Sequence, residues 1–153
     1  MISPETLRFY SLFANQNNEM LMQIAMLANE KKVDSGYQLF FEGEIAKYLY
    51  LIRDGSVVLT MNMGEAGDKR VEELEPISKG EVVGWSSIIS PHLYKMGAYT
   101  DEASHLLEFD GEKLRELFDN NPSFGYFFVK NLAEVIGERL ISKCVQLMSL
   151  VSD

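Results

Sequence analysis

The segment from Lys79 to Thr100, KGEVVGWSSIISPHLYKMGAYT, contains the residue types of an anion-binding loop. The Gly80-Glu81 pair and a second glycine, Gly84, precede a short stretch that can begin a helix. Unpaired N–H groups at a helix start bind phosphate and other anions. The segment contains no arginine, and its one interior lysine is Lys95. The sequence therefore predicts an anion-binding loop that lacks its strongest counter-charge.

Other motifs with chemical function are weak. His92 and His105 lie far apart in the sequence and have no carboxylate cluster beside them, which argues against a metal site. GWSSI is not the Gly-x-Ser-x-Gly turn of a serine hydrolase, and we expect no enzyme activity. The single cysteine, Cys144, excludes an intrachain disulfide and a four-cysteine iron–sulfur centre, and it fits the cytoplasm. His92, His105 or Cys144 could supply an axial ligand to haem, and we disfavour this alternative.

The composition indicates one globular domain without a nucleic-acid or membrane surface. The 153 residues carry a net charge of −9, and residues 36–110 hold thirteen acidic and six basic residues, a net charge of −7. This negative field repels phosphate backbones, so we expect no direct binding to DNA or RNA. The start, MISPETLRFY, lacks the apolar core of a signal peptide, and no apolar run approaches the roughly 18 residues that cross a bilayer.

The elements that position the loop are predicted to be helices, then strands, then helices. In residues 1–33, Ser3 and Pro4 are typical of an N-cap and a first helical turn. A second helix is predicted from Asn17 or Asn18 through EMLMQIAMLANEKK, with its two lysines near the C-terminus.

Residues 34–110 are predicted to form a β-roll. The runs YQLFFEGE, KYLYLIRDGSVVLTMNM and RVEELEPISKGEVVG are β-branched or aromatic and are interrupted by glycine, and MGAYT and SHLLEF supply later strands. Asp54-Gly55 predicts a tight hairpin between YLIR and SVVLT, and NMGEAGDKR predicts a longer hairpin loop. Many short strands with frequent turns are typical of a small barrel or roll.

Residues 111–153 are predicted to be helical. Asp110 can cap GEKLRELF, and Asn121 with Pro122 is a typical start for a long second helix. One apolar face of the long helix, with Phe124, Phe127, Phe128 and Val135, is expected to pack on the β-roll. The other face is expected to form a homodimer in coiled-coil fashion, and it contains Val129, Leu132, Ile136, Leu140, Cys144, Leu147 and Val151. Burial of the whole helix in its own monomer is the alternative.

This order of elements resembles the cyclic nucleotide-binding domain family, which includes the catabolite activator protein and the regulatory domains of some kinases and channels. The resemblance implies one α+β domain over residues 1–153, a jelly-roll β-roll with N-terminal helices and a long C-terminal helix. It also implies a regulatory role in signal transduction. The residues that carry it are GYQLFFEGE with Gly36 and Gly43, YLYLIRDGSV with Gly55, the Gly80-Glu81 pair and LLEFD at Leu106–Asp110.

In this family the Gly-Glu loop forms a phosphate-binding cassette, which the resemblance places at residues 80–98. Backbone N–H groups bind the cyclic phosphate, a glutamate accepts from the ribose 2′-hydroxyl, an arginine pairs with the phosphate, and a Thr or Ser contacts the base. Carried over residue by residue, the ligand site contains Gly80, Glu81, Val82, Val83, Gly84, Trp85, Ser86, Ser87, Tyr94, Lys95, Met96 and Gly97.

The cassette departs from the family pattern at its strongest contacts. Counting back from LLEFD, Tyr94 stands in the place of the arginine and Gly97 in that of the Thr or Ser. Strand alternation turns Lys95 away from the pocket if Tyr94 points into it. A hydrogen bond to a charged group contributes roughly 1.5–3 kcal/mol, so the missing arginine should weaken cyclic nucleotide binding by roughly 10- to 100-fold. For Glu81 two roles stay open, ribose binding and bonding to local backbone N–H groups.

Two functions from different classes follow. The first is a sensor domain in which a cyclic nucleotide or another nucleotide shifts the long helix. The second is a ligand-free interaction module in which that helix pairs with itself or with a regulatory protein. If Tyr94 fills the pocket together with Trp85 or Met96, the second is favoured. The helix-turn-helix domain of many bacterial relatives needs about 60 residues beyond Asp153, so we disfavour a direct transcription factor.

Overall fold

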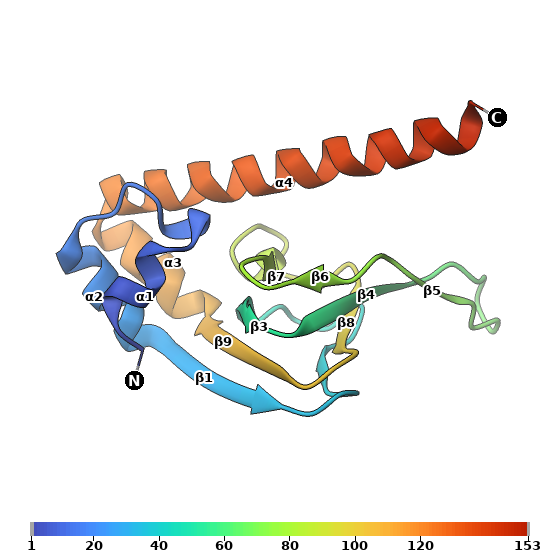
Figure 1. Ribbon diagram of the computed structural model, residues 1–153, viewed down its shortest axis with the longest axis horizontal. Helices are drawn as coiled ribbons and strands as arrows, with labels where there is room; N and C mark the ends of the chain where they lie inside the picture. Colours follow the sequence, from blue (N-terminus) through green and yellow to red (C-terminus); the bar gives the residue numbers. More distant parts are fainter. Residues whose placement is uncertain (1, 153) are drawn as a thin grey trace.

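The computed structural model describes residues 2–152, with helices at both ends of a β-roll (Figure 1). The N-terminal helices are α1 (Pro4–Arg8), the 3₁₀ helix η1 (Ser11–Phe13) and α2 (Asn18–Leu27). The side chain of Ser3 accepts a hydrogen bond from the N–H group of Thr6, which confirms the predicted N-cap.

The second helix is shorter than predicted. It ends at Leu27, and Ala28–Val33 forms strand β1, which pairs antiparallel with β9 (Ser104–Asp110). The Lys31 amine lies 3.1 Å from the Glu108 carboxylate, whose side chain is only 6% exposed. Pairing with β9 therefore overrides the helix propensity of this segment. The β-roll begins at Ala28, within the region predicted to be helical.

Two antiparallel sheets form the roll and confirm the predicted α+β jelly-roll fold. The first sheet has the order β1-β9-β3-β7, and the second has the order β2-β8-β4-β5, with β6 paired to β4. The bounds of the remaining strands are β2 (Gln38–Phe40), β3 (Tyr48–Asp54), β4 (Ser56–Asn62), β5 (Val71–Glu73), β6 (Ile77–Ser78), β7 (Val82–Val83) and β8 (Gly97–Thr100).

The turn at Gly55 joins the two sheets, so the predicted hairpin at Asp54-Gly55 is wrong. Strand β3 belongs to the first sheet and β4 to the second. Gly55 has a φ of +99°, and an added Cβ would lie 2.2 Å from Ser104 Oγ. The Ser104 hydroxyl accepts a hydrogen bond from the N–H group of Ser56 at 3.1 Å. The glycine is required for a tight corner, and the turn residues do not specify which sheet the next strand joins. The longer loop between β4 and β5 is the hairpin loop predicted from NMGEAGDKR.

Helices α3 (Gly111–Asn120) and α4 (Pro122–Val151) complete the fold. Asp110 caps α3, because its carboxylate accepts from the N–H groups of Glu112 and Lys113. Asn121 does not cap α4 through its side chain, which instead donates to the carbonyl of Leu117. Within residues 2–152, no helix is both long enough and apolar enough to cross a bilayer.

Two hydrophobic clusters stabilise the domain, and α4 takes part in one of them only with its first half. The cluster between the first sheet and the helices contains Phe13, Phe109, Phe124, Phe128 and Leu132. A second cluster fills the interior of the roll, and its members include Phe40, Tyr50, Ile52, Tyr94 and Leu106. Figure 1 shows the second half of α4 running past the roll to the C-terminus.

The apolar face predicted for a homodimer is divided. Leu132 is buried in the monomer and Ile136 is partly buried against the same cluster. The other members are exposed, namely Val129, Leu140, Cys144, Leu147 and Val151. Only the outer part of this face is thus available to a partner.

Candidate functional site

The cassette turns sharply at Gly84 and continues as the 3₁₀ helix η2 (Trp85–Ser87). Gly84 has a φ of +86°, and an added Cβ would lie 2.7 Å from the Tyr48 carbonyl oxygen, so the turn requires glycine. The N–H group of Ser87 donates to the Gly84 carbonyl at 3.1 Å, and its buried hydroxyl donates there at 2.8 Å. Ser87 therefore closes the turn. The sequence predicts that its amide binds a ligand, but in the structure this amide donates to the Gly84 carbonyl.

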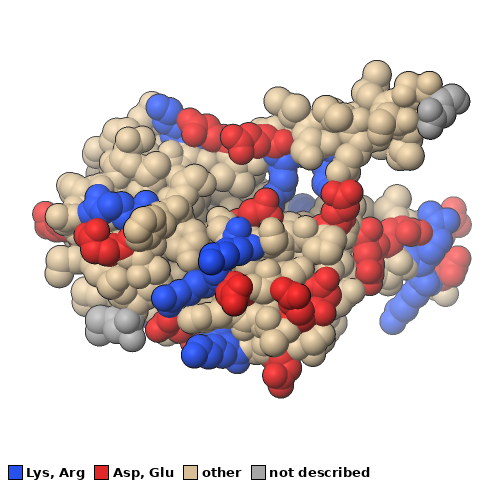
Figure 2. Space-filling model, in the orientation of Figure 1, with Lys and Arg blue, Asp and Glu red and all other residues tan. Residues whose placement is uncertain are grey.

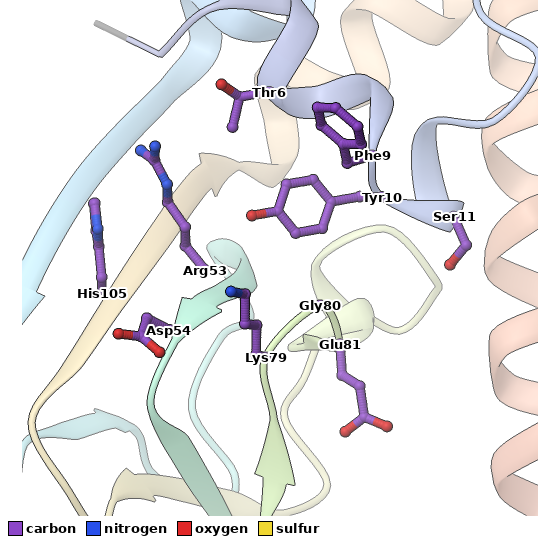
Figure 3. Close-up of a pocket in the computed structure, with 10 residues that line it drawn as sticks. All are labelled: Thr6, Phe9, Tyr10, Ser11, Arg53, Asp54, Lys79, Gly80, Glu81 and His105. Carbon is purple, nitrogen blue, oxygen red and sulfur yellow. The ribbon is translucent and has the colours of Figure 1, made fainter.

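Glu81 lies on the outer side of the cassette. Its side chain is exposed and accepts a hydrogen bond from the N–H group of Ser78 at 3.1 Å. Figure 3 shows the carboxylate directed away from Arg53 and Lys79. Of the two roles left open for Glu81, the structure shows the second, a hydrogen bond to a local backbone N–H group.

A cavity of about 130 Å³ lies on the inner side of the cassette, and we name it the cassette pocket. Small-molecule sites usually have volumes of about 300–1,000 Å³, so a whole nucleotide needs side chains of this pocket to move. Its lining consists of Phe40, Leu59, Val83, Gly84, Trp85, Ser86, Lys95, Met96 and Arg139. Six predicted site residues are therefore brought together, whereas Gly80, Glu81, Val82, Ser87, Tyr94 and Gly97 do not line it.

Tyr94 lies in the interior of the roll, stacked on Phe40. The two ring centroids are 3.8 Å apart with an interplanar angle of 9°. The Tyr94 hydroxyl donates to the Tyr48 carbonyl at 2.7 Å and accepts from the Tyr48 N–H group at 3.0 Å. Burial raises the pKa of Tyr94 to about 12, which keeps the phenol neutral at physiological pH. Tyr94, which the family pattern puts in the place of the arginine, does not line the cassette pocket, and its phenol bridges β3 to the segment before β8.

Lys95 lines the pocket and Tyr94 does not, so the condition under which strand alternation would turn Lys95 away is not met. Residues 95–96 form a bend, and β8 begins only at Gly97, so the alternation of side chains along a strand does not apply here. The side chain is exposed, and within residues 2–152 the Lys95 amine has no hydrogen bond or ion pair.

Arg139 of α4 is the pocket residue that sequence analysis missed. Its Nη2 donates to the Val82 carbonyl at 2.5 Å, and the guanidinium lies over the Trp85 ring, 4.9 Å from the centroid. Its Nη1 is buried and has no hydrogen-bond partner among the described residues. Burial lowers the pKa of Arg139, and the Glu81 carboxylate acts in the opposite direction. A guanidinium stays charged in proteins, so the pocket keeps this cation.

A polar stripe on α4 was the available signal for Arg139. Arg139, Lys143 and Gln146 recur at steps of four and three residues, which places them on one face of a helix. This face is directed to the roll, since the Gln146 amide donates to the Glu75 carboxylate at 2.9 Å. Figure 2 shows basic side chains reaching into the hollow between α4 and the roll.

A wider and more open cleft of about 990 Å³ lies outside the roll, between the N-terminal helices and the first sheet (Figure 3). The Glu30 carboxylate lies beside this cleft, 2.8 Å from Arg53 Nη1 and 3.2 Å from His105 Nε2. Asp54 and Glu81 add further negative charge to its lining. We therefore take the cassette pocket, whose lining has two cations and no carboxylate, as the candidate site despite its smaller volume.

The histidines are separated in space as well as in sequence. His92 Nδ1 lies 3.1 Å from the Ser86 carbonyl oxygen, whereas His105 lies beside Glu30 at the outer cleft. In the part of the chain that the structure describes, no group of three His, Cys, Asp or Glu side chains could hold a metal ion.

Comparisons with known proteins agree on one family. The cyclic nucleotide-binding domain model matches residues 30–121, more than half of the chain. A search of curated proteins finds no match.

Three solved structures illustrate the likeness. A protein of Geobacter metallireducens GS-15, described as a cyclic nucleotide-binding protein, is 31% identical to this chain. Its TM-score is 0.81, over 92% of this chain and 99% of that one. The catabolite activator protein of Thermus thermophilus is 23% identical, with a TM-score of 0.71 over 92% of this chain and 63% of that one. A cyclic nucleotide-binding domain of Methylobacillus flagellatus KT is 18% identical, with a TM-score of 0.79 over 96% and 81%. The last two likenesses concern the fold alone.

Proposed function

Because the chain belongs to the cyclic nucleotide-binding domain family, we propose that it is a regulatory domain that binds a small anionic ligand in the cassette pocket. The observation that carries this proposal is the pair of cations, Lys95 and Arg139, in a lining without a carboxylate. Cations without acidic partners favour an anion, and charge-assisted hydrogen bonds to phosphate or carboxylate are among the strongest.

Cyclic AMP and cyclic GMP remain candidate ligands, with weaker binding than the family pattern implies. Glu81 is outside the pocket, so it cannot accept from a ribose hydroxyl there. Tyr94 supplies no charge and does not line the pocket, although its ring is stacked on Phe40, which does. The ring of Trp85 offers a stacking surface for a base only after Arg139 leaves it.

We expect phosphate, cyclic AMP and cyclic GMP to raise the melting temperature of the protein. A ligand at 100 times its dissociation constant stabilises the folded state by about 2.7 kcal/mol, which corresponds to several degrees for a domain of this size. Differential scanning fluorimetry followed by calorimetric titration measures the effect. Sodium chloride at matched ionic strength is the control, since it reproduces only screening. If no anion exceeds this control, the cassette pocket is not a ligand site.

A second candidate function, self-association through α4, is favoured by the outer face of that helix. Leu140, Ile141, Val145 and Met148 are each more than 60% exposed. Apolar side chains on successive turns of a helix usually lie against another surface. Of these four, only Leu140 belongs to the predicted dimer face, but Ile141, Val145 and Met148 recur at the same coiled-coil steps of four and three residues. We propose a second copy of the chain as the partner.

Analytical ultracentrifugation tests this association. We expect a dimer at micromolar concentration for the unchanged protein and a shift towards monomer for Leu140→Glu, because a buried carboxylate is costly in an apolar interface. Ser123→Glu adds the same charge to the exposed first turn of α4 and should leave the dimer unchanged. A monomer for the unchanged protein contradicts the homodimer.

A further inference from the structure

We infer that Arg139 of α4 is the group that binds the ligand's negative charge, so that anion binding and the position of α4 change together. This inference rests on the proposed function and specifies its ligand class, an anion of the size of phosphate or a carboxylate. The β-roll supplies Lys95 and the floor of the pocket, and the helix supplies the guanidinium.

The hydrogen bonds of Arg139 leave it ready for an anion. A guanidinium has five N–H donors, and here one acceptor, the Val82 carbonyl, is bonded to Nη2. Nη1 is buried without a partner among residues 2–152. Two guanidinium nitrogens form the planar fork that binds phosphate or carboxylate in a bidentate manner. An anion in the pocket would give Nη1 the acceptor that the protein does not provide.

The acids near Arg139 do not take this role. Within the described residues, no carboxylate lies in ion-pair contact with the Arg139 guanidinium, and the Glu81 carboxylate is bonded to the Ser78 N–H group. Glu81 and Glu138 line a neighbouring cavity of about 310 Å³ together with Arg139, but neither lines the cassette pocket. The pocket lining to which Arg139 contributes therefore contains Lys95 and Trp85 but no acid.

The attachment of α4 makes Arg139 suitable as a sensor. Buried apolar contacts hold the helix up to Leu132, with Val135 and Ile136 partly buried beside them. Beyond that point, the contacts between α4 and the roll among the described residues include the hydrogen bond from Arg139 to Val82, the stacking of Arg139 on Trp85 and the hydrogen bond from Gln146 to Glu75. If the guanidinium exchanges the Val82 carbonyl for an anion, it alters one of the contacts that position this half of the helix.

The chain contains two natural reporters for the test. Trp85 is the single tryptophan, and the guanidinium of Arg139 stacks on it. Cys144 is the single cysteine and is exposed on α4. Trp85 fluorescence therefore reports occupancy of the pocket, and energy transfer from Trp85 to a dansyl group on Cys144 reports movement of the helix.

The experiment titrates sodium phosphate, sodium acetate and cyclic AMP at constant ionic strength into the full chain. We expect each bound anion to change Trp85 fluorescence and energy transfer to Cys144. Arg139→Gln should weaken phosphate binding by about 10-fold or more and abolish the change in energy transfer. Arg139→Lys keeps the charge but loses the planar fork, so it should bind with intermediate affinity. Lys130→Gln, an exposed change on the same helix, should behave as the unchanged protein.

The outcomes separate this inference from the proposed function. If phosphate binds the unchanged protein and Arg139→Gln equally well, Arg139 is not the anion-binding group, although the pocket remains a ligand site. If none of the three anions changes the fluorescence or melting temperature of the unchanged protein, both proposals are wrong. Should Arg139→Gln fail to fold, equal phosphate affinity of Arg139→Lys and the unchanged protein would overturn the bidentate contact.

Discussion

Tyr94→Arg is expected to destabilise the protein by about 3–5 kcal/mol, the usual cost of a buried charge without a partner. The position is 4% exposed and its ring is stacked on Phe40 inside the roll. A guanidinium there loses its hydration and removes the hydroxyl that bonds both backbone groups of Tyr48. The change therefore damages the roll and does not restore a phosphate-binding arginine to the pocket.

Urea denaturation measures this effect, and two variants serve as controls. Tyr94→Phe keeps the stacked ring but leaves the Tyr48 N–H and carbonyl groups without their partner, so we expect a loss of about 1–3 kcal/mol. Lys95→Arg introduces the same guanidinium one residue further along, where the side chain is exposed, and should leave the stability unchanged. A stable Tyr94→Arg protein that binds phosphate more tightly would contradict the placement of this side chain.

Phe128→Ala is expected to lower the free energy of unfolding by about 3–5 kcal/mol. The Phe128 ring is fully buried and contacts three other rings, with centroid distances of 6.0 Å to Phe13, 4.7 Å to Phe118 and 6.2 Å to Phe124. These rings come from η1, α3 and α4, so the cavity opens where three elements meet. The loss combines the transfer of the ring to water with incomplete closure of the cavity.

The matched control for this change is Val129→Ala, the next residue of α4. Its side chain is 47% exposed, so we expect a change within about 0.5 kcal/mol. Both variants are compared by urea denaturation, with the slope of the transition as a test of two-state unfolding. Equal midpoints for the two variants would show that α4 is not held through its aromatic face.

The order of the helices and strands was predictable from the sequence, but their boundaries were less so. Glycine positions, short apolar runs and helix caps are local signals, and they correctly predicted helices before and after a roll. The failures concern interactions between distant segments. Ala28–Val33 is a strand because it pairs with β9, and the chain changes sheets at Gly55 because β4 pairs with β5, β6 and β8 rather than with β3.

The candidate site was predicted only as far as the cassette extends along the chain. Residues around Gly84 and Trp85 reach the pocket as predicted, since the turn itself places them there. Lys95 lines the pocket and Tyr94 does not, and strand alternation does not decide between them because a bend precedes β8. Arg139 comes from a distant helix, and its contact with Val82 depends on how α4 crosses the roll. A family pattern carried over along the chain cannot supply such a residue.

The way α4 is held has a mechanical consequence. At about 1.5 Å of rise per residue, Arg139 lies about 10 Å and Val151 about 28 Å along the helix from Leu132, the last fully buried residue of the anchor. A rigid rod that pivots at this anchor moves its tip nearly three times as far as the point where Arg139 lies. A displacement of a single bond length at the cassette is thus amplified to several tenths of a nanometre at the tip, where the exposed apolar side chains lie.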